Sequence, residues 1–287
     1  MSEGARPRTI RLPGEGSFLV DAAVDAELLV AWIAAHRATA DTERILKRNL
    51  GTFVTRVRVP DRAAASDLPR EVVVKEVPVR PGSRWRFFLG APPRLAREFA
   101  VHRRLRAAGF RSPRPLAASL RLRGATEMIV SEFLDGFTPL HTLLWLAPPE
   151  RRRSVEPARI LGLAGDWLRR LHETGIWQRD MKPSNLLTRD GEFCLVDVAA
   201  IRFLRAPLDH ERRVRNLTQL LDLSADLDGP PRAAMLRAYL GSEEGLDAWL
   251  HEVGEAIERR RTRRERRCGH RHVDEEHRAS SESRGEP

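Results

Sequence analysis

The stretch from His172 to Phe203 constrains the fold of this chain more than any other part of the sequence. It contains the motif Asp-x-Lys-x-x-Asn, formed by Asp180, Lys182 and Asn185. A short polar turn follows, and then an apolar run that ends in Asp197. This pattern predicts a loop and a β-hairpin that brings Asn185 and Asp197 together at one end. Their amide and carboxylate oxygens suit Mg²⁺, and Asp180 on the approaching loop is left to orient a hydroxyl.

An aspartate, then an asparagine, then a metal-binding aspartate is the order of the protein-kinase catalytic loop. A lone D-x-x-x-x-N is common, and the Pro-Ser-Asn segment at 183–185 would fit any turn. The alternative, in which Asp180 and Asn185 are only turn residues, is weakened because other members of the kinase set occur upstream in the same order.

The upstream candidates are a lysine in a strand and a glutamate in a helix. The run EVVVKEVPV at 71–79 predicts a strand with Lys75 inside it. A charge there is costly unless it is paired or exposed. Lys75 either faces water from an edge strand or contacts the α- and β-phosphates of ATP and pairs with a helix glutamate. Glu98, in the helix predicted over 94–108, is the natural partner.

Charge composition adds to this interpretation. The formal net charge is +10, which indicates an anionic partner: a nucleotide, a nucleic acid or an acidic membrane surface. Among 50 basic residues the lysines are only Lys47, Lys75 and Lys182. A chain that uses arginine almost everywhere retains lysine where a compact ammonium is required, although a codon bias would give the same composition.

The expected nucleotide contacts are weaker around the phosphate loop. Only Gly51 is present in place of a glycine-rich motif, so phosphate contact there would rest on backbone N–H groups with help from Lys47 or Arg48. The strand predicted over 126–133 leaves through an acidic linker, where a two-lobed kinase has its hinge. Backbone groups of Glu132 and Leu134 would be available to adenine there.

The order of elements predicts an α+β chain with a two-lobed, protein-kinase-like fold, which has a small antiparallel-sheet N-lobe and a mostly helical, shortened C-lobe. We expect an N-terminal extension with a helix at 1–40, of which 1–20 is poorly ordered, an N-lobe at 41–131, a hinge and C-lobe at 132–257, and an Arg-rich disordered tail at 258–287. Too little helix follows Asp197 for the platform on which protein kinases dock peptides. This favours a small-molecule or glycolipid acceptor.

The sequence also indicates a compartment. Cys194 and Cys268 make no disulfide framework, as in a reducing cytosol. The N-terminus lacks the apolar core of a signal peptide. The longest apolar run, 28–35, is shorter than the roughly 20 residues that a membrane span needs. We expect a monomer in the cytoplasm, either free or bound at a membrane surface.

Over about residues 45–245 the sequence resembles the lipopolysaccharide-core kinases, the Kdo/heptose kinase family of the protein-kinase-like superfamily. Besides the catalytic set, the likeness rests on LARE at 95–98 through Gly109 with SPRPL at 112–116, on LHETGI at 171–176, and on 213–221 with LRAYL at 236–240. The last of these discriminates best, because protein kinases lack it.

The resemblance implies transfer of the ATP γ-phosphate to a sugar hydroxyl of the lipopolysaccharide inner core. By position it implies Lys75 and Glu98 as the phosphate lysine and its partner. It implies Asp180 as the catalytic carboxylate, with Asn185 and Asp197 as Mg²⁺ ligands.

Two departures from the kinase pattern bear on this assignment. Gln178 replaces the histidine that usually precedes Arg-Asp, a change expected to affect packing rather than chemistry. Lys182 is the residue that Ser/Thr protein kinases use against the γ-phosphate.

Three hypotheses therefore stay open. They are a sugar or glycolipid kinase, a Ser/Thr protein kinase, and a non-catalytic nucleotide-binding scaffold or nucleic-acid binder. No catalytic position is lost, which disfavours the scaffold. Aromatic residues are not interleaved with the arginines of 259–271, which disfavours nucleic acid. That arginine-rich stretch would instead hold the protein on an anionic membrane surface, or simply keep it soluble.

Overall fold

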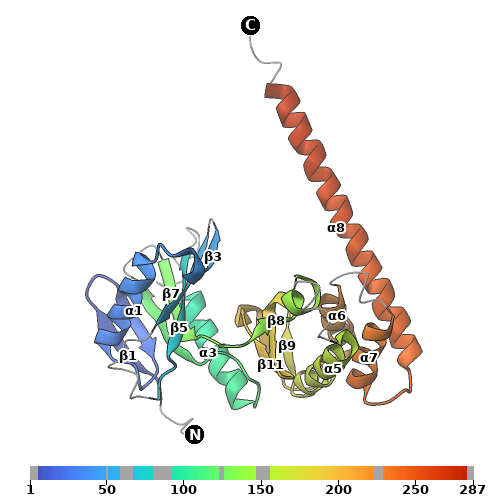
Figure 1. Cartoon of the computed structure of the whole chain (residues 1–287), viewed down its shortest axis with the longest axis horizontal. Helices are drawn as coiled ribbons and strands as arrows, with labels where there is room; N and C mark the ends of the chain where they lie inside the picture. The colour runs from blue at the N-terminus through green and yellow to red at the C-terminus, as the bar shows by residue number, and fades with distance from the viewer. Residues whose placement is uncertain are drawn as a thin grey trace. The chain divides into compact units, whose positions relative to one another are not determined.

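The computed structural model describes residues 6–49, 51–58, 67–79, 92–122, 126–146, 156–222 and 229–282. The chain divides into two compact units, which are described separately below (Figure 1). Unit 1 comprises Met1–Phe137 and Leu187–Ile201, and unit 2 comprises Thr138–Leu186 and Arg202–Pro287.

Unit 1 is built on a seven-stranded antiparallel sheet with the order β1-β2-β6-β7-β5-β4-β3. Its strands are β1 (Arg8–Leu12), β2 (Gly16–Val20), β3 (Ile45–Asn49), β4 (Thr52–Arg58), β5 (Glu71–Pro78), β6 (Pro115–Leu122) and β7 (Thr126–Glu132). Its helices are α1 (Ala26–Ala38) and α3 (Arg94–Ala107), with the short η1 (Thr42–Arg44) and η6 (Val198–Ala200). The hairpin of β10 (Leu186–Arg189) and β11 (Glu192–Leu195) completes it.

The two helices cover opposite faces of this sheet. Side chains alternate along a strand, so Val72 and Val74 of β5 pack with α1, whereas Val77 packs with α3. The same alternation directs Lys75 toward α3 and Glu76 toward α1. The sequence pattern of β5 therefore decides which helix each charged side chain meets.

Contacts between α1 and the sheet are polar as well as apolar. Trp32 of α1 is fully buried in the core. The buried His36 contacts Thr55 of β4, with Nδ1 and Oγ1 separated by 2.7 Å, and its Nε2 lies 3.3 Å from a carboxylate oxygen of Glu76. The hydrogen bond with His36 lowers the pKa of Glu76 to about 2.

The expectation that residues 1–20 are poorly ordered is wrong for β1 and β2. These strands form a hairpin with Gly14 in its turn and Gly16 at the start of β2, both at positive φ, a conformation that glycine adopts readily. Phe18 and Val20 are buried in the core with α1. Strand β2 pairs with β6, which is distant in the sequence. The arginines and prolines of this segment suggested disorder, because the pairing that stabilises the strands is a tertiary contact.

Unit 2 is mostly helical, as expected. It contains α5 (Pro157–Glu173), α6 (His210–Leu221), α7 (Pro230–Leu240) and α8 (Leu246–Glu282), the turns η4 (Thr142–Leu146) and η5 (Pro183–Asn185), and the short strands β8 (Thr138–Pro139), β9 (Ile176–Gln178) and β12 (Ile201–Phe203). Gly165 allows α5 and α7 to approach closely, because a Cβ there would collide with the carbonyl oxygen of Met235.

The tail at 258–287 was expected to be disordered, and this is wrong for 258–282, which continue α8 (Figure 1). Arginine and glutamate are good helix formers, and pairs such as Arg259 with Glu255 lie one turn apart. Arg260 also binds Asp222, at the end of α6, at 2.8 Å. Residues 283–287 lie outside the described part. No described helix is long and apolar enough to cross a membrane.

Candidate active site

In unit 1, strand β5 and helix α3 bring Lys75 and Glu98 together as predicted. The lysine Nζ lies 3.0 and 3.2 Å from the two carboxylate oxygens of Glu98. Glu98 is only 4% exposed and Lys75 18%. Burial raises the pKa of Glu98, and the Lys75 ammonium offsets part of this rise. Lys75 is thus held on the face of the sheet that α3 covers, and the alternative of an edge-strand lysine facing water is wrong.

Asp197 contacts the same ammonium, with 3.4 Å between Lys75 Nζ and Asp197 Oδ1. It follows β11 and has left-handed backbone angles, φ 51° and ψ 53°. A non-glycine residue in this conformation is uncommon, and such strain is concentrated at functional sites. The side chain is 50% exposed, so a carboxylate held by Lys75 remains accessible. Sequence reasoning did not predict this contact.

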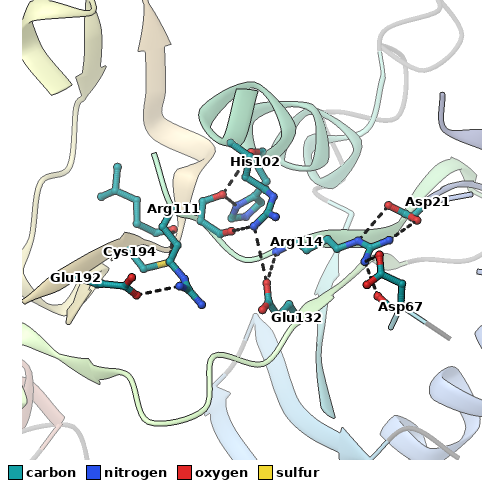
Figure 2. Close-up of polar contacts among 11 residues, drawn as sticks. Asp21, Asp67, His102, Arg111, Arg114, Glu132, Glu192 and Cys194 are labelled. Atoms are coloured by element: carbon teal, nitrogen blue, oxygen red, sulfur yellow. Dashed lines mark hydrogen bonds and ion pairs between the residues drawn. The ribbon is translucent and has the colours of Figure 1, made fainter. Parts of the chain in front are cut away.

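Beside the site, the segment after α3 links several elements of unit 1 (Figure 2). The backbone N–H of Glu132 donates to the carbonyl of Arg114 at 2.9 Å, and the Glu132 carboxylate accepts from the Arg114 N–H at 3.0 Å. The Arg114 guanidinium donates to Asp21 at 2.9 Å and to the carbonyl of Asp67 at 2.7 Å. The Glu132 N–H is therefore occupied by Arg114, and the adenine contacts expected of Glu132 and Leu134 stay predictions.

The same segment anchors α3. His102 Nδ1 lies 2.9 Å from Ser112 Oγ, and Arg106 donates to the Ser112 carbonyl at 3.0 Å (Figure 2). Burial, and then the positive charge of Lys75, lower the pKa of His102 to about 3. His102 and Ser112 were not predicted as site residues, although both fall in stretches that carried the family resemblance.

Gly51 and Lys47 lie on the hairpin of β3 and β4. A Cβ placed on Gly51 would meet no described atom within 4 Å, so the backbone is open to close approach. Lys47 pairs with Val54 in the ladder and is exposed. Their contact with phosphate stays a prediction.

In unit 2, Asp180, Lys182 and Asn185 form a compact loop. Lys182 Nζ lies 2.8 Å from Asp180 Oδ2, and both side chains are about half exposed. The Asp180 carbonyl accepts from the Lys182 N–H at 2.9 Å and from Asn185 Nδ2 at 3.1 Å. Because the amide nitrogen of Asn185 is used inside the loop, its Oδ1 is the atom suited to bind a cation.

Amide side chains beneath this loop fix its backbone. Gln219 of α6 accepts from the Met181 N–H at 3.0 Å and donates to the Arg179 carbonyl at 3.1 Å, and these residues flank Asp180. Gln178 is buried, and its side chain accepts from the Asp180 N–H at 3.3 Å. Its role is therefore in packing and in supporting the loop.

A second buried chain of hydrogen bonds starts at α7. Arg213 donates to the Tyr239 hydroxyl at 3.1 Å, and this hydroxyl lies 2.8 Å from His172 Nδ1. His172 Nε2 lies 3.1 Å from Asn216 Oδ1, and Asn216 Nδ2 donates to the Gln178 carbonyl at 2.7 Å. Burial lowers the pKa of His172 to about 4. Asn216, Gln219 and Tyr239 were not predicted as site residues, although all three fall in the stretches at 213–221 and 236–240 singled out for the family.

The structure thus brings three predicted residues together in each unit. Lys75, Glu98 and Asp197 meet in unit 1, and Asp180, Lys182 and Asn185 meet in unit 2. A metal shared by Asn185 and Asp197 stays a prediction. Among the described residues there is no cluster of three or more His, Cys, Asp or Glu side chains able to hold a metal.

The comparisons with known proteins bear on this arrangement. The model of the lipopolysaccharide kinase (Kdo/WaaP) family matches residues 80–239, more than half of the chain. The match includes Glu98 and the loop of unit 2, but it begins after Lys75. A solved structure, WaaP in complex with acyl carrier protein, is similar with a TM-score of 0.51 and 18% identity, over 84% of this chain and 98% of that one. No curated protein matches.

The structural similarity confirms the expected protein-kinase-like fold. The family match confirms the expected class of enzyme, a phosphotransferase with an alcohol group as acceptor. The chain therefore belongs to the lipopolysaccharide kinase (Kdo/WaaP) family.

Proposed function

We propose that this protein transfers the γ-phosphate of ATP to a sugar hydroxyl, of Kdo or heptose, in a lipopolysaccharide inner-core glycolipid. The observation that carries the proposal is the Lys75 ammonium, held by the buried Glu98 and contacted by Asp197. A lysine so held presents a fixed positive charge, as phosphoryl transfer requires. Family membership supports the glycolipid acceptor.

In unit 1, Lys75 contacts the α- and β-phosphates, and Glu98 sets its position. Gly51 lets the phosphates approach the backbone between β3 and β4, and Lys47 offers them an ammonium. The Glu132 carbonyl and the Leu134 N–H contact adenine. The exposure of Lys47 and the open space at Gly51 agree with these roles.

In unit 2, Asp180 orients the sugar hydroxyl and accepts its proton as the oxygen attacks the γ-phosphorus. The bond from phosphorus to the β,γ-bridging oxygen breaks, and ADP leaves. Lys182 balances charge on the transferred phosphoryl group. The 2.8 Å contact between Lys182 and Asp180 supports a shared role for the two side chains.

The donor atoms present fit Mg²⁺. Asn185 offers an amide oxygen and Asp197 an accessible carboxylate, and Mg²⁺ favours such oxygen ligands with waters completing its shell. When bound, Mg²⁺ would neutralise charge on the β- and γ-phosphates. Asn185 and Asp197 are the residues that would hold it.

Transfer of labelled phosphate from ATP tests the proposal, with extracted core glycolipid and a generic protein as parallel acceptors. We expect label on the glycolipid with wild type and almost none with Asp180→Asn, which has a similar size and no charge. Label on protein alone would favour the Ser/Thr protein-kinase alternative. ATP binding without transfer to either acceptor would favour the scaffold.

We propose further that the arginines of 259–271 hold the enzyme on the anionic cytoplasmic face of the inner membrane. Each basic residue near such a surface contributes about 1 kcal/mol. Co-sedimentation with anionic vesicles should therefore weaken at high salt, because exposed charges are screened within about 10 Å at 0.1 M. Binding that is indifferent to salt, or equal with neutral vesicles, would contradict this.

A further inference from the structure

Helices α6 and α8 of unit 2 enclose a groove of about 710 Å³, a size typical of ligand sites. Five arginines line it: Arg215 from α6, and Arg259, Arg260, Arg263 and Arg264 from α8. The four arginines of α8 are spaced so that they share one side of the helix. The groove therefore concentrates positive charge in a concave site.

Carboxylates near the groove orient these arginines without neutralising all of them. Asp222 is buried and binds Arg260 at 2.8 Å and also Arg264. Glu211 is the acid that lines the groove, among the described residues. In the part of the chain that the structure describes, neither Arg215 nor Arg263 forms an ion pair. Their guanidinium groups remain suited to bind phosphate or carboxylate through paired hydrogen bonds.

The wall of the groove on α6 leads directly to the catalytic loop. Gln219 lines the groove and also binds the backbone on both sides of Asp180, at Met181 and Arg179. Arg215 lies 5.9 Å from the ring centre of Trp177, on the strand that leads into this loop. A ligand in the groove would therefore be only one side chain away from the loop.

A further polar group in this wall lacks a partner. Thr218, between the groove and the core, is only 6% exposed, and its buried Oγ1 has no hydrogen-bond partner among the described residues. Buried hydroxyls are usually satisfied. Rotation about its Cα–Cβ bond would let this hydroxyl donate to a bound anion.

We propose that the α6–α8 groove binds the acidic groups of the glycolipid acceptor and thereby delivers its sugar hydroxyl to the catalytic loop. This inference rests on the proposed function and adds the acceptor site to it. The wall formed by α8 lies beyond the matched residues 80–239, so this arginine face is a feature of this chain outside the part shared with the family model.

Binding of lipid A, a bis-phosphorylated glycolipid, in neutral detergent micelles tests the proposal on the full chain. The variants are Arg215→Gln and Arg263→Gln, and the matched control is Arg266→Gln. Arg266 is equally an exposed arginine of α8 but does not line the groove. We expect each groove variant to bind about tenfold more weakly, the effect of one charge-assisted hydrogen bond. The control should bind as wild type does, and thermal unfolding should show that all variants fold.

Three further measurements separate binding in the groove from general electrostatic attraction. Dephosphorylated lipid A should bind weakly to wild type, because the groove recognises the acidic groups. With core glycolipid as substrate, Arg263→Gln should raise KM for the glycolipid and leave KM for ATP unchanged. Vesicles of phosphatidylglycerol should not distinguish Arg263→Gln from Arg266→Gln, because a general surface charge attracts both equally.

Equal losses with Arg263→Gln and Arg266→Gln on lipid A would overturn the inference, since net charge alone would then explain binding. Tight binding of dephosphorylated lipid A would overturn it too. Phosphate transfer unaffected by the groove variants would refute the groove and leave the proposed function standing. Lipid A binding that depends on the groove, without any transfer, would refute the proposed function and leave the anion site in place.

Discussion

The buried His172 predicts a specific loss of stability in acid. Its pKa is lowered from 6.5 to about 4 in the folded chain, so the native state holds it neutral where the unfolded chain protonates it. The unfolded state then binds one more proton, and stability falls as pH decreases through this window. This pKa shift contributes about 3 kcal/mol to the free energy of unfolding. The contribution is present above pH 6.5 and is lost by about pH 4.

The variant His172→Gln isolates this contribution. Glutamine can donate to Asn216 and accept from Tyr239, but it does not titrate. Across the window from 6.5 to about 4, wild type should lose about 3 kcal/mol more than the variant in urea unfolding. Groups that titrate in both proteins, including His102, cancel in this difference.

The control for His172→Gln is His251→Gln, a change at an exposed histidine of α8. It removes one histidine without touching the buried chain of hydrogen bonds. Its unfolding curve should follow that of wild type throughout. If His172→Gln and wild type lost stability in parallel, the reasoning from burial would be refuted.

Three substitutions test the assigned roles in catalysis. Asp180→Asn should slow transfer by roughly 10²-fold or more with nearly unchanged Mg·ATP affinity, and single-turnover rates equal to wild type would remove the assignment. Asp197→Ala should weaken Mg·ATP in equilibrium binding and also slow the reaction; unchanged affinity would mean that the metal binds elsewhere. Lys75→Arg should be poorly active in steady-state assays, because guanidinium is larger and planar, whereas full activity would show that any positive charge suffices.

The parts of the site that sequence predicted are those that local patterns encode. Lys75 falls in a β-branched run and Glu98 on a helical face, so strand alternation and helical spacing alone place them on facing surfaces. The hairpin predicted before Asp197 is also present. Its turn, Asp190-Gly191, has positive φ at both positions, and the Asp-Gly dipeptide favours such turns.

What sequence did not predict depends on contacts between distant segments. Gln219 supports the loop at Asp180 from 38 residues away at Met181, and no periodicity marks a buried amide for that task. The strands β1 and β2 become stable only against β6. The length of α8 was not predicted either. Arg260 of this helix forms an ion pair with Asp222, 38 residues away in the sequence.

Strand β5 couples the N-terminal segment to Lys75. Glu76 is bound by His36 of α1, and the adjacent Lys75 is bound by Glu98 of α3. A slip of β5 by one residue would exchange these partners and break both contacts at once. The contact of α1 with Glu76 therefore helps to fix the register of β5 in the sheet. Deleting the segment that carries α1 would remove this constraint, which keeps Lys75 facing α3.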